Sequence, residues 1–321
     1  MPSSQTLALP SARDIDLLHD RINQWYLQHA RDLPWRTGAN TSWEVMVSEF
    51  MLQQTPVKRV LPVWETWLER WPTPADLAAE EPGEAVRAWG RLGYPRRAQR
   101  LHAAAVAVLE RHGGKVPASY EELLALPGVG SYTAAAISVF AFGRRATVID
   151  TNIRRVHARL ISGKALPSKA LTAAETRLAE ALMPEDLAES NLWNVSVMEL
   201  GALICTAKSP SCEQCPVLDR CAWVAAGKPE ADYQPKGQAW AGTDRQLRGA
   251  MLAVLRAASG GISPELLTSG GKKPDFAYPA ELAPAVRALA ALNSPSEQID
   301  RCYAGLLADG LTQEKAGLVS L

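Results

Sequence analysis

The sequence has no long apolar run, no alternating β-branched stretches and no net charge. Without any run of 18 apolar residues, no membrane span is expected. Residues 1–10 lack a basic start followed by an apolar run, so no signal peptide is predicted. Without alternating runs of β-branched residues in the first 226 residues, strands are not expected there. The Lys+Arg and Asp+Glu totals are both 34, so the overall charge gives no argument for or against a nucleic-acid partner.

Cysteine is also scarce, and its distribution is the most informative feature of the chain. Four of the five cysteines form a C-x6-C-x2-C-x5-C pattern, at Cys205, Cys212, Cys215 and Cys221. Thiolates at such spacing hold a metal ion or an iron–sulfur cluster, and the spacing leaves zinc and iron–sulfur both open. Reduced thiols of this kind favour a cytoplasmic protein. The fifth, Cys302, lies in a helical pattern and is expected to be a buried, inert thiol.

Basic residues are concentrated in one part of the chain. Residues 86–164 hold thirteen Lys or Arg and four Asp or Glu. A local surplus of nine basic residues fits a polyanionic partner such as DNA. A solvated face balanced by neighbouring acids in the fold is an equally good interpretation of the charge alone.

Helical periodicity dominates the first 226 residues, with Gly and Pro at the predicted helix ends. Residues 227–244 are rich in Gly, Pro, Gln and Lys and are predicted to be a linker. The remaining residues, 245–321, show three helical patterns followed by a short apolar end. Helices ending in a small hairpin predict a winged-helix-like appendage; a simple helical appendage is the alternative. The helices predicted in the chain are Ala12–Ala30, Ser42–Gln54, Pro62–Trp71, Ala75–Ala79, Pro82–Arg91, Arg96–His112, Tyr120–Ala125, Ser131–Ala141, Asn152–Leu160, Lys169–Leu182, Ala188–Ile204, Gln246–Ala258, Pro279–Leu292 and Ser296–Ala308.

A glycine-bounded turn joins two of these helices at Leu126-Pro-Gly-Val-Gly-Ser-Tyr-Thr133. Gly128 and Gly130 lack a Cβ, so the backbone can approach a bulky ligand closely. The amides that begin the next helix then point toward any anion. The pattern predicts a helix-hairpin-helix element that grips a DNA phosphate. A tight helix–helix turn without a ligand is the alternative.

An acidic residue follows twenty residues after Gly130. Asp150 comes after an apolar pair and precedes a predicted helix, in Val-Ile-Asp-Thr-Asn-Ile-Arg-Arg. It is placed to cap that helix. The position also suits a catalytic carboxylate that faces a groove.

Taken in order, the helices, the glycine-bounded turn, Asp150 and the four cysteines resemble the endonuclease III superfamily of DNA glycosylases over residues 12–226. The resemblance implies an all-α helix-hairpin-helix glycosylase fold and a [4Fe-4S] cluster on the four cysteines. It also implies an iron–sulfur domain from residues 1–37 and 145–226, and a six-helix barrel domain from residues 38–144. Residues 245–321 form a small C-terminal domain in this interpretation.

Three further segments are similar to the MutY branch of that superfamily, the adenine glycosylases. They are Leu33-Pro-Trp-Arg36, Ser48-Glu-Phe-Met-Leu-Gln-Gln-Thr55 and Trp89-Gly-Arg-Leu-Gly-Tyr94. Relatives that also cut the DNA backbone carry a lysine where this chain has Tyr132, and that amine forms a Schiff base. The resemblance therefore implies a monofunctional glycosylase that removes adenine opposite 8-oxoguanine or guanine.

The resemblance also implies a role for each site residue. Glu49 lies in an apolar stretch, where burial is expected to raise its pKa, and is the candidate general acid. Asp150 is the candidate anion that stabilises the charged sugar, with Asn152 and Tyr132 beside it. The residues matched to DNA are Arg31 and Trp35 for the adenine pocket, Gln54 and Tyr94 as wedges, Thr55 and Leu92 for the opposite base, and Gly128, Val129 and Gly130 in the hairpin. Arg96, Arg97 and Arg100 match neighbours of phosphates.

The chain departs from the family in its tail and at a few positions. No Phe-Ser-His sequence occurs, and the tail is too short and too helical for the family's Nudix-like module. Val195 stands where many relatives place Gln or Glu, and Pro56 and Pro95 flank the expected wedges. Two alternatives stay open: a thymine or uracil mismatch glycosylase, and a non-catalytic iron–sulfur DNA-binding protein. We expect a monomer, associated with the nucleoid and bound to mispaired double-stranded DNA.

Overall fold

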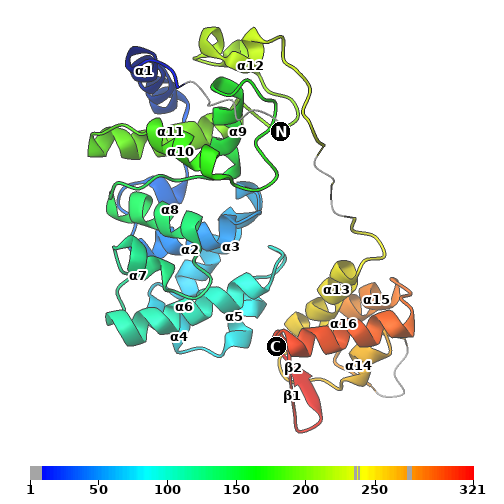
Figure 1. Cartoon of the computed structure of the whole chain (residues 1–321). Coiled ribbons are helices and arrows are strands. Elements are labelled where there is room, and N and C mark those ends of the chain that lie inside the picture. Colours follow the sequence, from blue (N-terminus) through cyan, green and yellow to red (C-terminus); the bar gives the residue numbers. More distant parts are fainter. Residues whose placement is uncertain (1–8, 235–236, 238, 273–276) are drawn as a thin grey trace. The chain divides into compact units, whose positions relative to one another are not determined.

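A computed structural model describes residues 9–234, 237, 239–272 and 277–321. The described chain is almost entirely helical, which confirms the predicted all-α class (Figure 1). Residues 235, 236 and 238 of the predicted linker lie outside the described residues. None of the helices described is long and apolar enough to cross a membrane.

The helical elements follow one another with short connections. The α-helices are α1 (Ala12–His29), α2 (Ser42–Leu52), α3 (Val57–Arg70), α4 (Pro74–Ala78), α5 (Pro82–Ala88), α6 (Arg96–His112), α7 (Tyr120–Leu124), α8 (Ser131–Phe142), α9 (Thr151–Leu160), α10 (Ala173–Ala181), α11 (Leu187–Leu203), α12 (Ala222–Ala225), α13 (Asp244–Ala257), α14 (Glu265–Thr268), α15 (Ala283–Ala290) and α16 (Ser296–Ala308). Short 3-10 turns lie at η1 (Pro34–Arg36), η2 (Cys212–Gln214), η3 (Leu218–Arg220) and η4 (Ala280–Leu282).

Two predicted helix starts were wrong. Helix α3 begins at Val57, and Pro62, predicted to open the helix, lies inside it. Its ring removes one backbone donor, and the helix accommodates the loss. Helix α10 begins at Ala173 because Thr172 caps it: the Thr172 hydroxyl accepts from the Glu175 amide, and the Glu175 carboxylate accepts from the Thr172 amide.

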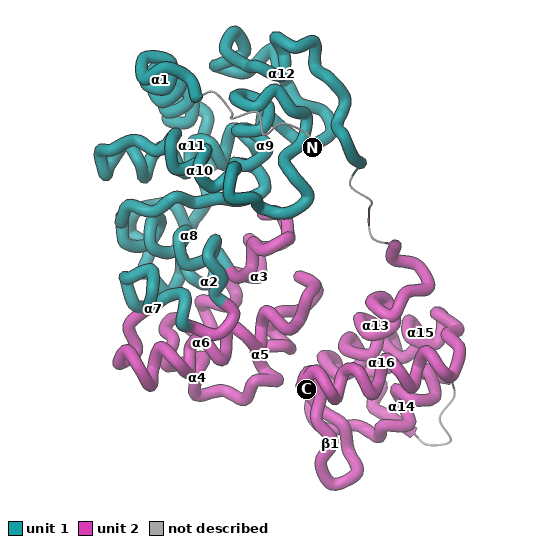
Figure 2. The backbone as a smooth tube through the Cα atoms, in the orientation of Figure 1, with its two compact units in different colours: residues 1–49, 117–125, 129–235 teal, residues 50–116, 126–128, 236–321 magenta. Residues whose placement is uncertain are grey.

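The chain divides into two compact units (Figure 2). One unit contains residues 1–49, 117–125 and 129–235; the other contains residues 50–116, 126–128 and 236–321. The division falls inside α2, between Glu49 and Phe50. The domain boundaries inferred from the family resemblance stay predictions.

The first unit is built around α11, against which α1 and α9 both pack. Each helix turns apolar residues at helical spacing inward: Ile22 and Trp25 from α1, Val156 from α9, and Val197 and Leu200 from α11. Burying these side chains is the main favourable term in forming the unit. The resulting core fixes the start of α9, where Asp150 stands.

In the second unit, α4 and α5 pack on α6 around buried tryptophans. The rings of Trp67 and Trp71 meet edge to face with centroids 4.6 Å apart, and Trp67 meets Trp89 at 5.7 Å. These edge-to-face contacts bury large aromatic surfaces in fixed orientations. The cluster supports the turn after Trp89, which carries Leu92 and Tyr94.

The tail forms helices α13 to α16 followed by a β-hairpin. Strands β1 (Gln313–Lys315) and β2 (Leu318–Ser320) pair antiparallel, with Glu314 opposite Val319. Ile262 adds a bridge on the other side of Val319, through two backbone hydrogen bonds of 2.9 and 2.8 Å. The predicted hairpin after the last helix is therefore present, in a winged-helix-like order.

Candidate active site

Glu49 is buried near the end of α2, with 5% of its surface exposed. The Tyr132 hydroxyl donates a hydrogen bond of 3.1 Å to Glu49 Oε2. The pKa of Glu49 is raised to about 7, chiefly by burial and less by the charge of nearby Asp150, while Tyr132 and Arg36 oppose the shift. A carboxyl with this pKa still holds its proton in a large share of molecules near neutral pH.

Asp150 caps the N-terminus of α9. Its Oδ1 accepts from the Ile153 amide at 2.6 Å, and its Oδ2 accepts from Asn152 Nδ2 at 2.8 Å. Burial raises the pKa of Asp150, and these donors, together with the charge of Arg155, hold the rise back. Capping α9 therefore does not exclude a catalytic role for the same carboxylate.

The two carboxyl groups face unlike surroundings. Glu49 receives one hydrogen bond, from the hydroxyl of Tyr132, whereas Asp150 receives N–H donors at a helix start. N–H donors and the helix dipole favour a charged acceptor. The arrangement therefore favours a protonated Glu49 and a negatively charged Asp150. A general acid and a stabilising anion that act on the same bond need these opposite protonation states.

Behind Asp150 lies a chain of contacts that leads to the cysteines. Arg155 donates to Asn152 Oδ1 at 2.7 Å, and also to the carbonyls of Gly201 and Cys205, each at 2.7 Å. A Cβ added to Gly201 would stand 2.7 Å from the Asn152 Cβ. Only glycine lets α11 approach α9 this closely. The side chain that orients Asp150 is thus itself held by the segment that carries the first cysteine.

The four cysteines, none in a disulfide, are partly buried and line one small pocket. Their other neighbours are apolar, including Ile204 and Leu218, except for Arg159. Arg159 donates to Cys205 Sγ at 3.4 Å and stacks over the Trp223 ring at 4.7 Å. Burial and the neighbouring cysteines raise the pKa of the Cys215 thiol to about 11. Four cysteines this close together can be thiolates only when a cationic centre neutralises their charge. An apolar enclosure with four sulfur donors fits an iron–sulfur cluster.

Arg31, predicted to line the adenine pocket, forms an ion pair with the buried carboxylate of Glu199. Its Nε and Nη2 contact the two Glu199 carboxylate oxygens at 2.7 Å each, and Arg36 Nη1 adds a third contact of 3.0 Å. These cations lower the pKa of Glu199. Trp35, the other predicted pocket residue, is 7% exposed. Their contact with adenine stays a prediction.

Glu199 and Arg36 were missed by sequence reasoning. Glu199 stands in an apolar run of α11, between Met198 and Leu200, with no side-chain exposure. An acid in an apolar helix is the same signal that marked Glu49, and it could have been noticed. Its two arginine partners lie more than 160 residues away, so the sequence did not pair them.

The predicted wedge residues share a rare backbone conformation. Gln54 has φ of +56° and Tyr94 has φ of +48°. Non-glycine residues in this region are uncommon and cluster at functional sites. Next to them, the Thr55 hydroxyl contacts the Leu92 carbonyl at 3.2 Å, so the two residues predicted for the opposite base lie together.

Arg97 holds both of these turns from inside. It is 6% exposed and donates to the Thr55 hydroxyl at 2.8 Å and the Gly93 carbonyl at 3.0 Å. It also donates to the carbonyls of Phe50 and Met51. The prediction that Arg97 neighbours a phosphate was wrong, because a buried guanidinium with backbone partners is a structural clamp.

The glycine-bounded turn has the geometry that the sequence suggested. Gly128 has φ of +77°, and a Cβ there would stand 2.6 Å from the Arg100 Cβ and 3.1 Å from the Phe50 ring. Val129 is buried, whereas Gly130 is exposed and precedes α8 without a side-chain cap. A helix start without a side-chain cap suits an external acceptor such as a phosphate. Phosphate binding itself stays a prediction.

Part of the basic surplus in residues 86–164 is internal. Arg97, Arg155 and Arg159 are buried, and Arg87 and Arg154 pair with Glu84 and Glu175. The basic residues left exposed are Arg91, Arg96, Arg100, Arg111, Lys115, Arg144, Arg145 and Lys164. The exposed acids of the same stretch are three glutamates, so the surface remains basic.

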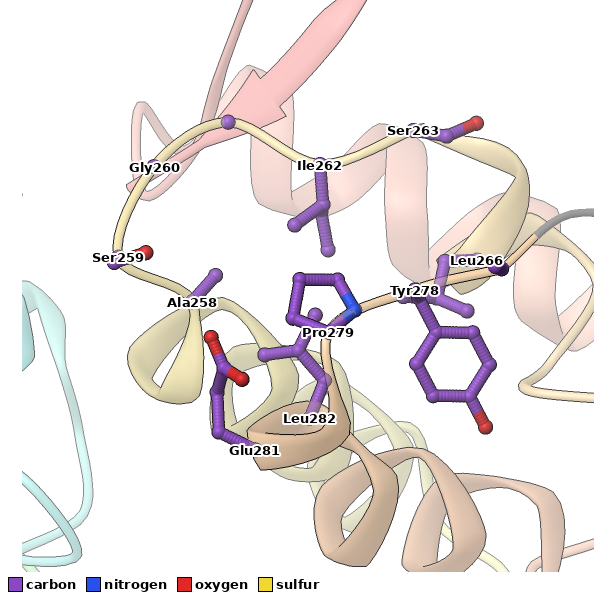
Figure 3. Close-up of a pocket in the computed structure, with 12 residues that line it drawn as sticks. Ala258, Ser259, Gly260, Ile262, Ser263, Leu266, Tyr278, Pro279, Glu281 and Leu282 are labelled. Atoms are coloured by element: carbon purple, nitrogen blue, oxygen red, sulfur yellow. The ribbon is translucent and has the colours of Figure 1, made fainter.

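A pocket of about 330 Å³ lies elsewhere, in the tail (Figure 3). Ile262, Leu266, Pro279 and Leu282 line it, with Glu281 as its carboxylate. None of the predicted site residues lines this pocket. Glu281 is the one carboxylate among the lining residues, so the two carboxyl groups of Glu49 and Asp150 are the stronger candidates for acid–base chemistry.

Comparison with known protein families gives matches to the parts of the chain that contain the two carboxyl groups and the four cysteines. Residues 47–181 match the family model of the HhH-GPD superfamily base excision DNA repair proteins, and residues 205–221 match the iron-sulfur binding domain of endonuclease III. The second match covers all four cysteines and selects iron–sulfur over zinc.

Among curated proteins, the chain is 49% identical to the adenine DNA glycosylase of Mycobacterium tuberculosis (strain ATCC 25618 / H37Rv), over 73% of this chain and 77% of that protein. It is 42% identical to the adenine DNA glycosylase of Mycolicibacterium smegmatis (strain ATCC 700084 / mc(2)155) over 292 residues, 91% of each chain. Since only 243 residues precede Asp244, the latter similarity extends into the tail.

Two solved structures share the fold. A thermostable thymine-DNA glycosylase superposes with a TM-score of 0.60 at 27% identity, covering 67% of this chain and 98% of that one. A non-covalent endonuclease III–DNA complex superposes with a TM-score of 0.59 at 23% identity, covering 68% and 99%. The second likeness shows the fold alone.

Proposed function

Since this chain belongs to the adenine DNA glycosylases of the helix-hairpin-helix base excision repair superfamily, we propose that it removes adenine from duplex DNA where the adenine lies opposite 8-oxoguanine or guanine. The reaction is hydrolysis of the bond between adenine and deoxyribose. The observation that carries the proposal is the pair of Glu49, buried under the Tyr132 hydroxyl, and Asp150, held by the start of α9.

Glu49 supplies the proton. Adenine leaves poorly as an anion, so an acid must protonate a ring nitrogen as the bond breaks. A pKa of about 7, raised by burial, lets Glu49 hold that proton near neutrality and release it to the base. The Tyr132 hydroxyl fixes the orientation of the carboxyl group.

Asp150 stabilises the positive charge that forms on the sugar, as the second carboxylate does in glycosidases. Asn152 and the Ile153 amide keep it oriented and favour its charged form. With a phenol rather than an amine at residue 132, no Schiff base can form, and the enzyme leaves an abasic site in an intact strand.

Extrusion of the adenine must precede the chemistry, and the gap in the duplex must be filled. Gln54 and Tyr94 are the proposed wedges, and their left-handed backbones are already set in the free protein. Thr55 and Leu92 are proposed to contact the opposite base. The iron–sulfur cluster on the four cysteines is structural in this account, holding the segment that positions Arg155. One complete site per chain is consistent with a monomer acting at the cell's DNA.

A duplex panel tests the proposal. Duplexes carrying A:8-oxoG, A:G, T:G and U:G are incubated with the purified protein, and abasic sites are then cleaved with alkali. We expect cleavage of the adenine strand in the first two duplexes, and only after alkali. Strand breaks without alkali would contradict the monofunctional chemistry, and no adenine release would overturn the proposal.

A second candidate is a thymine mismatch glycosylase. It is favoured by one observation: the chain is 33% identical to the thymine-DNA glycosylase of Aeropyrum pernix (strain ATCC 700893 / DSM 11879 / JCM 9820 / NBRC 100138 / K1) over 64% of this chain, and it shares that enzyme class's fold. Release from T:G in preference to A:8-oxoG in the same panel would select it. A protein that binds all four duplexes and cleaves none is the non-catalytic iron–sulfur protein.

A further inference from the structure

The loop that carries Leu92 and Tyr94 connects α5 to α6, and the tail contacts both of these helices. All of these elements belong to the same compact unit. None of the residues proposed for the reaction lies in the tail. Its polar contacts lie near the two ends of the loop.

On the α5 side, the contact is made by Arg87. Its Nη1 donates to the carbonyls of Leu255, Arg256 and Ala258, at 3.0, 2.6 and 2.8 Å. These carbonyls close helix α13 and have no partner within that helix. Arg256 returns a hydrogen bond of 3.1 Å to the Val86 carbonyl. A cation at a helix C-terminus is also favoured by the helix dipole.

On the α6 side, the contact is made by Asp309, at the end of α16. Its carboxylate, 16% exposed, pairs with Arg96 of α6 and with Arg248 of α13. Gln99, one turn further along α6, donates to the Gly310 carbonyl. At the start of α5, the backbone of Gly83 approaches Leu321 so closely that a Cβ there would lie 2.4 Å from the Leu321 carbonyl oxygen.

The loop between these contacts needs support. Tyr94 is one of five described non-glycine residues with positive φ, a conformation that persists only where its surroundings enforce it. Arg97 holds the inner side of the loop through Gly93. Arg96, two residues after Tyr94, is held by the tail.

We propose that the tail positions residues 91–97, which are the end of the loop after α5 and the first two residues of α6. In this proposal Asp309 is a positioning residue for reading the base opposite the adenine. It acts through Arg96 and touches no substrate. The expected effect of Asp309 on selectivity rests on the proposed function, whereas its expected effect on the loop does not. It gives the tail a role that requires no Phe-Ser-His sequence.

The test compares Asp309→Asn with Asp309→Glu in the full chain. Asparagine keeps the shape and removes the charge that two arginines share; glutamate keeps the charge. The matched control is Asp300→Asn, an exposed carboxylate of the same helix that makes no ion pair with any residue the structure describes. Thermal unfolding checks that all variants are folded.

The first readout is amide hydrogen exchange of residues 91–97, which needs no activity. We expect exchange to speed up about tenfold in Asp309→Asn, and to stay near wild type in Asp309→Glu and Asp300→Asn. Unchanged exchange in Asp309→Asn would overturn the inference.

The second readout is the single-turnover rate of adenine release from A:8-oxoG and A:G duplexes. We expect the ratio of the two rates to fall about threefold to tenfold in Asp309→Asn alone. An equal fall on both duplexes would point to general destabilisation and overturn the specificity role. A wild-type protein inactive on both duplexes would contradict the proposed function while leaving the exchange result intact, so the two failures are distinguishable.

Discussion

At the scale of single residues, Asp150 caps α9 and is also the proposed catalytic anion, and substitution can separate the two roles. We expect Asp150→Asn to abolish adenine release while duplex binding and stability are kept, since asparagine caps helices about as well as aspartate. Asp150→Ala should also be inactive but lose about 1 kcal/mol of stability with the cap. Single-turnover assays, gel shifts and thermal unfolding measure the three properties. Full activity in Asp150→Asn would remove Asp150 from the mechanism.

Glu49 should make stability depend on pH. Burial raises its pKa from 4.5 to about 7 in the folded protein, so the folded state holds the proton longer than the unfolded state does. The stability that protonated Glu49 contributes is fully present below pH 4.5 and is lost as the pH rises through about 7, which lowers the free energy of unfolding by about 3 kcal/mol.

Glu49→Gln cannot ionise and should remove this loss. We expect the variant to be inactive, yet more stable than wild type above pH 7, with the difference shrinking toward pH 4.5. Chemical denaturation at pH 5, 6, 7 and 8 measures it. The rate of base release by the wild type should fall in parallel as the pH rises through 7, because Glu49 loses the proton that it must donate. Equal stabilities of the two proteins at pH 8 would show that Glu49 is not held in its protonated form.

The sequence indicated the two carboxylates but not what surrounds them. Glu49 was recognisable as an acid in an apolar helix, and Asp150 as an acid before a helix. Arg97 was misassigned because an arginine in a basic stretch looks the same whether it faces solvent or backbone carbonyls. The carbonyls that it meets come from a segment more than 40 residues earlier, and local sequence contains no signal for such a contact.

At the scale of helices, the close approach of α9 and α11 depends on Gly201. Gly201→Ala would place a methyl group 2.7 Å from the Asn152 side chain and 3.0 Å from its carbonyl. We expect a loss of about 1–3 kcal/mol from overpacking. Activity should fall as well, because Asn152 orients Asp150. Thermal unfolding and single-turnover rates measure both.

Gly249 in α13 provides the matched control. An added Cβ there meets only the Trp240 ring, at 3.9 Å, so Gly249→Ala should be neutral or stabilise by up to about 1 kcal/mol. If both alanine variants behave alike, close helix packing is not what fixes Asn152.

Helix positions followed from sequence better than helix boundaries did. Apolar spacing located α1, α6 and α16 almost to the residue, whereas the start of α3 was misplaced at Pro62. Proline is favoured at helix starts but does not have to stand there. The packing of buried Val60 and Trp64 favours a helix that begins before Pro62, at Val57. The pairing of Ile262 with Val319 joins residues far apart in the chain, and no local pattern indicates it.

At the scale of the whole molecule, a formal charge of zero is compatible with binding to DNA because exposed basic residues outnumber exposed acids within residues 86–164. Affinity for a duplex should therefore fall steeply with salt, since each phosphate contact releases counterions. Arg144 is exposed beside the end of α8, and we expect Arg144→Gln to weaken binding and reduce the slope of log K against log salt by about 1. Arg13, exposed among the acids at the start of α1, provides the control, and Arg13→Gln should leave the slope unchanged. Fluorescence anisotropy from 50 to 200 mM salt measures both slopes, and a wild-type affinity independent of salt would show that the basic stretch does not contact phosphates.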